Sequence, residues 1–428
     1  MRLEEKKITL LRKAKRVSQT SLAEAIHSHP LHIVKVEKGA ARYSDELLEL
    51  AKEFLGIKGM PLTQFECATC KERLDVMRDY IREARLKEAR EICSEMANLI
   101  NLEPCDNELP LLYRLYEVAL LLAERNLDTA KAKFDYLQSH YEDMNSEHLH
   151  YFYSNKGYLL IFDARYEDAL EHFKGAIEIS ARIPGFSAQE SARLHVLVAH
   201  CYSYLEYPYR AIFYVMKNYE LCMNKSAHPA NITADLLLAT NYIYVNNLKE
   251  VEAILNSCLK RAMSTRDDIR VGIAMHCYGL MYMKLERWHL AIEYLDKAIK
   301  FYAKESSQYL SILYRKIRSL VGDRKFSKAR KLISETEPLH GTNEVFSTYF
   351  KGIEHYITVL SRMSLYNEPS IKYIETVVLP HLTKTYGFFE AIDYYKLLEA
   401  YYKTKNNKKS LLMSEAIRKI YERCLLYD

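Results

Sequence analysis

The sequence predicts an all-α protein, in which a small N-terminal helical domain precedes a solenoid of about nine stacked helix pairs. Glycine and proline are scarce, at 12 and 10 of 428 residues, and no recurring alternation of apolar and polar residues indicates strands. Small residues recur at intervals of about 40 residues, which is typical of an internal repeat. Together these observations favour a helical repeat array.

The repeat is clearest in residues 151–181 and 278–299, where small residues lie where two antiparallel helices would touch. These are Gly157, Ala169 and Ala176 in the first stretch, and Gly279, Ala291 and Ala298 in the second. Aligning every pair on the residue that opens its second helix gives Ala89, Ala130, Ala169, Ala211, Val251, Ala291, Ala329, Ser370 and Ser410. The pattern resembles the tetratricopeptide repeat, although its interval of 38 to 42 residues exceeds the usual length of about 34. This resemblance implies a right-handed superhelical solenoid over residues 74–428.

The first domain is expected over residues 1–57, with helices at about 5–15, 19–26, 30–38 and 45–55. Ser18 and Ser44 suit N-caps, because a hydroxyl can accept hydrogen bonds from free backbone amides. Gly39 and Gly56 suit the helix ends that follow. Residues 58–73 contain Gly59 and Pro61 without a clear period, so we expect a linker there.

Two short helices joined by a tight turn are typical of a helix-turn-helix. The residues resemble the Xre-type DNA-binding domain of phage repressors at Ser18, Gln19, Leu22, Ala23, Ile33, Val36, Glu37, Gly39 and the closing segment 50–57. Arg16 and His27 depart from this family, which usually has glycine at both positions. A longer or differently shaped turn at His27 would be one consequence.

The resemblance implies that the helix over 30–38 enters the major groove of operator DNA. Base edges would then meet Pro30, Leu31, His32 and Lys35, while Gln19, Lys38 and Arg42 would hold phosphates. The alternative for each polar residue is an ordinary solvated side chain. Residues 1–57 hold 11 Lys and Arg against 8 Asp and Glu, so one copy would bind weakly and a homodimer is expected.

The tetratricopeptide resemblance also implies a concave face lined by the first helix of each pair. Its groove-facing positions, with two adjacent amides, carry over to Ser154, Asn155, Tyr158, Phe162, His200, Tyr204, Thr240, Asn241, Tyr244, His276, Met283, Tyr314 and Arg318. This mixture of apolar, amide and cationic groups suits a short peptide, and Arg318 suits its carboxylate. The structural alternatives are that Asn155 bonds between helices and that Arg318 pairs with a neighbouring Asp or Glu.

Sequence signals for catalysis and for cofactors are missing. The chain has no Gly-rich phosphate loop, H-E-x-x-H or G-x-S-x-G motif, and Cys67-x-x-Cys70 lacks a second ligand pair. We therefore expect no enzyme, no cofactor and no metal. The nine scattered cysteines, and the lack of both an 18-residue apolar run and a signal core, favour a cytoplasmic protein away from membranes.

An Xre-like helix-turn-helix followed by tetratricopeptide-like repeats resembles the RRNPP group of peptide-responsive regulators. The resemblance implies a cytoplasmic quorum-sensing transcription regulator, dimeric and switched by a signalling oligopeptide in its repeats; arbitrium-type phage receptors share the layout. The alternative is a Rap-like interaction protein whose repeats bind a response regulator or another protein. The last helices, over 391–428, would either cap the array or join two subunits.

Overall fold

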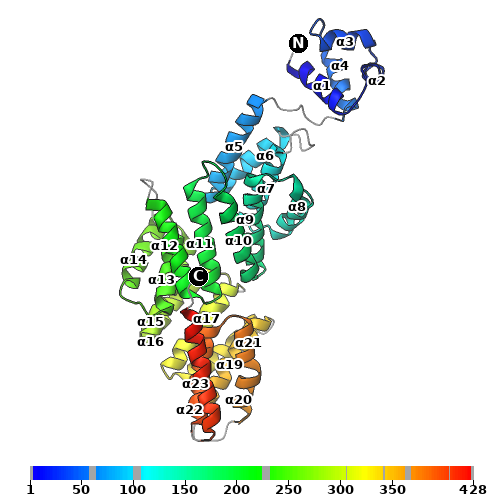
Figure 1. The fold of residues 1–428 in the computed structure, drawn as a ribbon. Helices are drawn as coiled ribbons and strands as arrows, with labels where there is room; N and C mark the ends of the chain where they lie inside the picture. The colour runs from blue at the N-terminus through cyan, green and yellow to red at the C-terminus, as the bar shows by residue number, and fades with distance from the viewer. Residues whose placement is uncertain are drawn as a thin grey trace. The chain divides into compact units, whose positions relative to one another are not determined.

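The computed structural model describes residues 3–56, 64–99, 108–223, 232–304, 306–340, 343–361, 368–403 and 405–425. Every regular element in these residues is a helix, which confirms the all-α prediction (Figure 1). The chain forms two compact units. The first unit contains residues 1–164 and 175–184, and the second unit contains residues 165–174 and 185–428.

The N-terminal helices lie within two residues of their expected bounds. They are α1 (Leu3–Ala14), α2 (Gln19–Ala25), α3 (Pro30–Glu37) and α4 (Asp45–Phe54). Both predicted N-caps are confirmed: the Ser18 hydroxyl accepts a 2.9 Å bond from the Ser21 amide, and the Ser44 hydroxyl accepts a 3.2 Å bond from the Leu47 amide. Local sequence therefore determines where these helices start.

An ion pair links the N-terminal helices around their apolar core. Arg12 Nε and Nη2 donate to the two Glu37 carboxylate oxygens at 2.6 and 3.0 Å, and Gln19 Nε2 donates to the same carboxylate at 2.6 Å. Both charged side chains are only 9% exposed. Burial opposes the charge on Glu37, but the hydrogen bonds from Arg12 and Gln19 outweigh it and lower the pKa of this carboxyl. The bidentate pair thereby fixes α1 and the start of α2 against α3.

The two positions that depart from the Xre pattern keep a backbone conformation that glycine adopts most readily. Arg16 and His27 both have φ of 55°, in the left-handed region. For a non-glycine residue this backbone conformation costs roughly 1–2 kcal/mol of conformational free energy. The helix-turn-helix geometry therefore forms without the two glycines.

The remaining described residues form nine helix pairs, which confirms the predicted number of repeats. The pairs are α5 (Gln64–Arg82) with α6 (Leu86–Leu99), α7 (Glu108–Ala123) with α8 (Leu127–Ser139), α9 (Ser146–Phe162) with α10 (Tyr166–Ser180), α11 (Ala188–Tyr204) with α12 (Pro208–Met223), α13 (Ile232–Tyr244) with α14 (Val251–Ser264), α15 (Asp268–Lys284) with α16 (Trp288–Ala298), α17 (Ser307–Gly322) with α18 (Phe326–His340), α19 (Glu344–Ser361) with α20 (Glu368–Tyr373) and α21 (Leu379–Lys384), and α22 (Phe388–Tyr402) with α23 (Asn407–Cys424). A π-helical turn, Ile374–Val378, joins α20 to α21, and short 3-10 turns lie at Tyr141–Asp143 and Ile299–Phe301.

The nine small residues used for the alignment are all buried at the seams within the pairs. Gly279 of α15 shows why size matters there, because a Cβ at this position would lie 2.6 Å from Leu295 Cδ2 on α16. The seam therefore depends on the missing side chain, as the sequence indicated.

The linker expected over 58–73 differs from the structure in its second half. Residues 57–63, with Gly59 and Pro61, lie outside the described residues, but α5 begins at Gln64. Cys70, Leu74 and Met77 are buried at helical spacing. This apolar stripe packs α5 onto α6 and α7, so tertiary burial extends the helix into a segment without a clear sequence period.

The Arg12–Glu37 pair predicts a local loss of stability on substitution. Glu37→Gln leaves the buried Arg12 cation without its partner, so the opening free energy of residues 19–37 should fall by about 3 kcal/mol. Native-state hydrogen exchange of these amides measures it. Glu49→Gln, which removes the exposed partner of Lys52, should change the value by less than about 0.5 kcal/mol. Equal effects of the two variants would contradict the structural role of the buried pair.

The seam at Gly279 predicts opposite effects for two glycine substitutions. Gly279→Ala forces a methyl into Leu295 and should destabilise the protein by about 1–3 kcal/mol. Gly175→Ala of α10 places its methyl 3.4 Å from the Tyr153 ring, which is an ordinary contact, so improved helix propensity should stabilise it by about 0.5–1 kcal/mol. The thermal unfolding midpoints of the two variants should move in opposite directions; a rise in both would rule out tight contact at Gly279.

Candidate functional site

The predicted DNA-contacting residues lie on and around α3, and they fall into two groups. Leu31 is 62% exposed, and Lys35, Lys38 and Arg42 are also exposed. These four side chains are available to a ligand. Lys35 lies on α3 itself, while Lys38 and Arg42 follow it. A helix that presents a lysine with a basic margin can enter a major groove.

The other three predicted DNA contacts have internal roles. Gln19 donates to Glu37, and Pro30 is half-buried at the first turn of α3. His32 lies between two internal partners, with Nδ1 3.0 Å from the Ser28 hydroxyl and Nε2 3.2 Å from the Arg42 carbonyl. These three side chains therefore help to hold the N-terminal helices in place.

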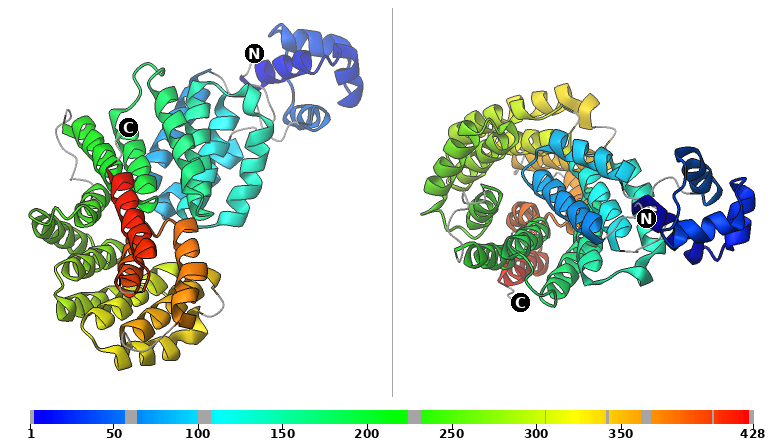
Figure 2. Two further views of the ribbon diagram at one scale, coloured as in Figure 1. Left: turned by 60° about the horizontal axis from the view of Figure 1, so that its bottom comes forward. Right: turned by 90° about the horizontal axis from the view of Figure 1, so that it is seen from above.

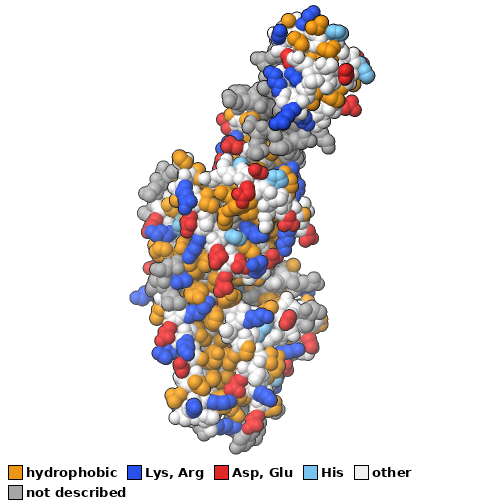
Figure 3. Space-filling model, turned by 45° about the vertical axis from the view of Figure 1, so that its right-hand side comes forward, with side chains coloured by type: hydrophobic (Ala, Val, Ile, Leu, Met, Phe, Trp, Pro, Cys, Tyr) orange, Lys and Arg blue, Asp and Glu red, His pale blue; other side chains and the backbone are white. Residues whose placement is uncertain are grey.

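Charge on the repeats gives no second basic surface on the face drawn in Figure 3. Lys and Arg side chains are interspersed there with Asp and Glu. On that face, no basic patch of the repeats competes with the exposed cations at α3 as a candidate for a nucleic-acid contact.

In the first unit, the predicted groove residues lie on α9, and two of them serve the fold. Asn155 is buried and donates a 2.8 Å hydrogen bond to the Leu115 carbonyl of α7. This is the structural alternative considered for it. Ser154 is also buried and donates to the His150 carbonyl at 2.8 Å. Tyr158 is half-buried and Phe162 is 39% exposed, so these two remain accessible.

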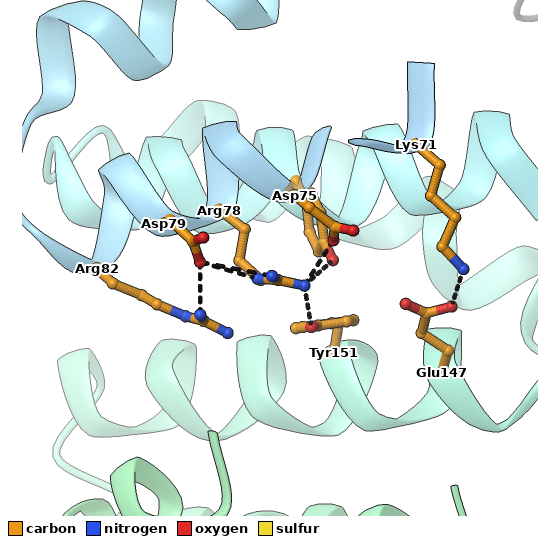
Figure 4. A network of polar contacts seen from close by, with 8 residues as sticks. Lys71, Asp75, Arg78, Asp79, Arg82, Glu147 and Tyr151 are labelled. Atoms are coloured by element: carbon orange, nitrogen blue, oxygen red, sulfur yellow. Dashed lines mark hydrogen bonds and ion pairs between the residues drawn. The ribbon is translucent and has the colours of Figure 1, made fainter. Parts of the chain in front are cut away.

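Charged residues that the sequence did not single out connect α5 with α9 in the same unit (Figure 4). Arg78 donates to Asp75 at 2.6 Å and also lies 3.4 Å from the Tyr151 hydroxyl of α9, while Lys71 pairs with Glu147 at 2.7 Å. α5 and α9 are first helices of pairs two places apart. Polar groups on these helices can therefore reach one another past the helix between them.

In the second unit, the predicted residues on α11 and α13 form aromatic and polar contacts. The Tyr204 ring stacks on Tyr166 at 4.5 Å, and the His200 ring lies 4.7 Å from Tyr204. Asn241 is fully buried and donates to the Ser203 hydroxyl at 3.1 Å, which links α13 to α11. Thr240 donates to the Leu236 carbonyl at 2.8 Å. Asn241 and Thr240 thus have partners inside the helix stack.

The predicted residues on α15 are half-buried, and Tyr314 on α17 is buried. Met283 packs against the apolar clusters of its neighbours, and Tyr314 is 4% exposed, with its ring 5.3 Å from Tyr349. His276 has one ring nitrogen that is buried and has no hydrogen-bond partner in the described part of the chain; His200 has another. A proton on either nitrogen would lack an acceptor.

Tyr244 and Arg318 contact the last helix pair. The Tyr244 ring stacks on Phe389 of α22 at 4.8 Å, with an angle of 2° between the planes. Arg318 pairs with Asp393 of α22 and lies 3.7 Å from Glu390. The alternative considered for Arg318, a pair with an acidic residue, is the arrangement observed. The sequence analysis named the right kind of partner for Arg318 but did not identify the helix that provides it.

Five residues that the sequence analysis did not select complete this contact. Arg315 donates to Glu390 at 3.2 Å, and Glu206 accepts a 2.7 Å bond from the Phe389 amide. We call Glu206, Tyr244, Arg315, Arg318, Phe389, Glu390 and Asp393 the closing cluster. One signal was present: two arginines three residues apart face two carboxylates with the same spacing, and both pairs are separated by 75 residues. Equal spacing and equal separation fit two parallel helices.

Glu206 caps α22 from a distance of 183 residues in sequence. Gly387, at the N-cap position of α22, provides no side-chain hydrogen bond, so a carboxylate from the end of α11 satisfies a free amide there. The positive end of the helix dipole favours this charge. Burial, and next the neighbouring Glu390, raise the pKa of Glu206 well above its usual range. The closing cluster therefore contains a carboxyl whose ionised form is disfavoured by its surroundings.

The second helix of the last pair strengthens the same contact. Arg423 of α23 donates to the Leu205 carbonyl at 3.2 Å, and its guanidinium lies 4.0 Å from the Tyr207 ring centre and 4.3 Å from that of Phe388. Figure 2 shows the red C-terminal helices beside the green helices of the fourth pair. The last pair thus packs back onto the fourth and fifth pairs rather than only onto the eighth.

Two further properties bear on the class of site. Within the residues described, no group of three His, Cys, Asp or Glu side chains is arranged to hold a metal ion. The described helices also include none with the length and apolar character needed to cross a membrane.

The unpartnered histidines predict a loss of stability in acid. Burial lowers the pKa of His200 to about 4; burial and then Arg315 lower the pKa of His276 to about 3. Because the unfolded chain binds these protons near pH 6.5, their contribution is complete above that pH and is lost as the pH falls. Between pH 6.5 and about pH 5 each should cost about 1 kcal/mol, allowing for partial exposure.

Thermal unfolding midpoints of the full chain against pH measure this effect. The variant with His200→Asn and His276→Asn should have a flatter profile over that range than the unsubstituted protein. Substitution of the exposed His289 by Asn should leave the profile unchanged. Parallel profiles for all three proteins would show that neither enclosed histidine is held neutral.

Comparison with known proteins gives relatives along most of the chain, although no protein-family model matches it. The transcriptional activator NprA of Geobacillus stearothermophilus is 24% identical over 391 residues, covering 88% of this chain and 93% of NprA. The regulatory protein RapD of Bacillus subtilis (strain 168) is 23% identical over 243 residues, covering 56% of this chain and 68% of RapD.

Solved structures share the fold over a similar span. A Rap protein in complex with Competence and Sporulation Factor superposes with a TM-score of 0.69 at 14% identity, covering 84% of this chain and 99% of that one. NprR in complex with its cognate peptide NprX gives a TM-score of 0.63 at 18% identity, covering 82% and 99%. The resemblance to the RRNPP group is thus confirmed, since this chain is similar in sequence to NprA and RapD and shares the tetratricopeptide-like fold of the Rap and NprR structures.

Proposed function

We propose that this protein is a cytoplasmic, homodimeric transcription regulator that binds operator DNA through α3 and is switched by a short oligopeptide held by its repeats. The single observation that carries the proposal is the pairing of a helix-turn-helix, with Leu31, Lys35, Lys38 and Arg42 exposed, with nine helix pairs in one chain. The likeness to the activator NprA over 88% of the chain supports it. An arbitrium-type role in a phage would be a special case of this activity.

The peptide-binding half of the proposal rests on the repeats. Of the structures that share this fold, the Rap protein was solved with Competence and Sporulation Factor and NprR was solved with its cognate peptide NprX. The second unit contains aromatic rings at Tyr204 and Tyr244 and cations at Arg315 and Arg318. Such groups suit the side chains and carboxylates of an oligopeptide.

A Rap-like protein that binds a protein partner is the second candidate, and the likeness to RapD favours it. In that case the N-terminal helices would be a docking domain. The exposed basic margin of α3 argues for DNA, because phosphate contacts need cations that are not already paired. DNA binding therefore separates the two functions.

The DNA-binding half predicts a specific effect of Lys35→Ala. A duplex selected by the full-length protein from a randomised pool should bind with steep salt dependence, and Lys35→Ala should weaken it about tenfold and reduce the salt slope by about one. Gel shifts at several salt concentrations measure both quantities. Lys52→Ala, which removes a cation paired with Glu49 on α4, is the matched control and should keep the affinity.

Failure to select any duplex would favour the protein-binding alternative. The peptide half is tested by calorimetry of the full-length protein with short synthetic oligopeptides, including any encoded next to its gene. A peptide that binds and also changes the affinity for the selected duplex is the expected result. Peptide binding with unchanged DNA affinity would contradict the switch.

A further inference from the structure

The closing cluster differs from ordinary contacts in a helical solenoid. In such arrays each repeat contacts mainly its neighbours, so stability is close to a sum of nearest-neighbour terms. Here the N-terminal turns of α22, in the ninth pair, contact Glu206 at the end of α11 and Tyr244 at the end of α13, in the fourth and fifth pairs. Together with Arg423 of α23, the start of α22 therefore joins the ninth pair to the fourth and fifth pairs.

The contacts of α22 have the chemistry expected of a bound acidic peptide. Phe389 presents an aromatic ring to Tyr244, and Glu390 and Asp393 present carboxylates to Arg315 and Arg318. The repeat resemblance makes Arg318 a candidate to hold the carboxylate of a ligand. The chain itself supplies that carboxylate in the structure. Residues 388–393 thus occupy the position of a guest.

Opening this contact has an electrostatic cost that a ligand with carboxylates can offset. Removal of α22 leaves Arg315 and Arg318 without their carboxylates, which is costly for cations this enclosed. It also moves Glu390 away from Glu206, where it is one of the causes of the raised pKa of the Glu206 carboxyl after burial. A ligand that restores carboxylates to the two arginines would remove most of the cost of leaving them unpaired.

We propose that the first turns of α22 are a built-in occupant of the peptide site, and that an oligopeptide carrying carboxylates competes with Glu390 and Asp393 for Arg315 and Arg318. Its binding releases α22 from α11 and α13 and so removes these contacts between the ninth pair and the fourth and fifth pairs. This inference rests on the proposed peptide response and adds its mechanism. A peptide with no preference between the closed and released forms would shift nothing.

The first measurement is hydrogen exchange of α22 in the full-length protein. In the variant with Glu390→Gln and Asp393→Asn, the amides of residues 388–396 should exchange about tenfold faster or more than in the unsubstituted protein. The matched control carries Glu399→Gln and Glu415→Gln, which remove two carboxylates from α22 and α23 that contact Ser414 and Lys419. Unchanged exchange in the first variant, or equal acceleration in both, would overturn the proposal.

The second measurement supplies the guest in trans. A labelled synthetic peptide of residues 387–396, GFFEAIDYYK, is titrated by fluorescence anisotropy with both full-length proteins. It should bind the Glu390→Gln, Asp393→Asn variant about tenfold more tightly than the unsubstituted protein, in which α22 competes. The same peptide carrying the two neutral substitutions should lose this binding. Equal affinity of the charged peptide for both proteins would contradict competition.

These results are independent of the proposed DNA response. Neither measurement uses operator DNA. Competition by α22 can therefore be observed even if no peptide changes the affinity for DNA, and a peptide can change the affinity for DNA even if α22 does not compete. If the double variant has a lowered unfolding midpoint, Asp393→Asn alone replaces it, because the Asp393 side chain is 41% exposed and its loss strains the core least. The single variant should show the same effects, reduced in size.

Discussion

The structure of the second unit depends on the match between two arginines of α17 and two carboxylates of α22. Arg315 and Arg318 lie one helical turn apart, and Glu390 and Asp393 repeat that spacing. Parallel first helices bring the two rows into register past the helix between them. Arg315, Arg318 and Glu390 are largely enclosed, whereas the Asp393 side chain is 41% exposed, so removing the partner of an enclosed charge is costly. The geometry therefore allows few intermediate states between a formed and a broken contact.

This constraint changes what the repeat array can do. A solenoid in which each repeat contacts only the adjacent repeats bends gradually. A solenoid in which two distant repeats also contact each other has two distinct arrangements, with that contact formed or broken. The long-range cap that Glu206 gives to α22 adds to this, since the end of α11 and the start of α22 satisfy one another. Such a device couples ligand chemistry to the relation between repeats, which fits peptide-responsive regulation.

The N-terminal domain uses a buried ion pair in another way. Arg12 and Glu37 sit at the meeting of α1, α2 and α3, and Gln19 completes the hydrogen bonds of the carboxylate. The consequence is a rigid α3 with Lys35 and its basic neighbours facing outward. Here the charges fix a surface, while in the repeats they hold a contact that can be exchanged.

Much of the fold follows from local sequence. Serine caps set the starts of α2 and α4, because a cap depends only on residues within one turn. The 40-residue spacing of small residues indicated the seams of the nine helix pairs, because the pattern repeats along the chain. The site was predictable only in part. Asn155 and Arg318 were placed on first helices correctly, but their partners, Leu115 and Asp393, are 40 and 75 residues away. No local pattern specifies such partners. The sequence by itself determined the helices, their pairing and the exposed face of α3. Only the tertiary structure decided that α22 lies against Tyr244 and Arg318. That contact arises from the path of five successive helix pairs and not from any one of them.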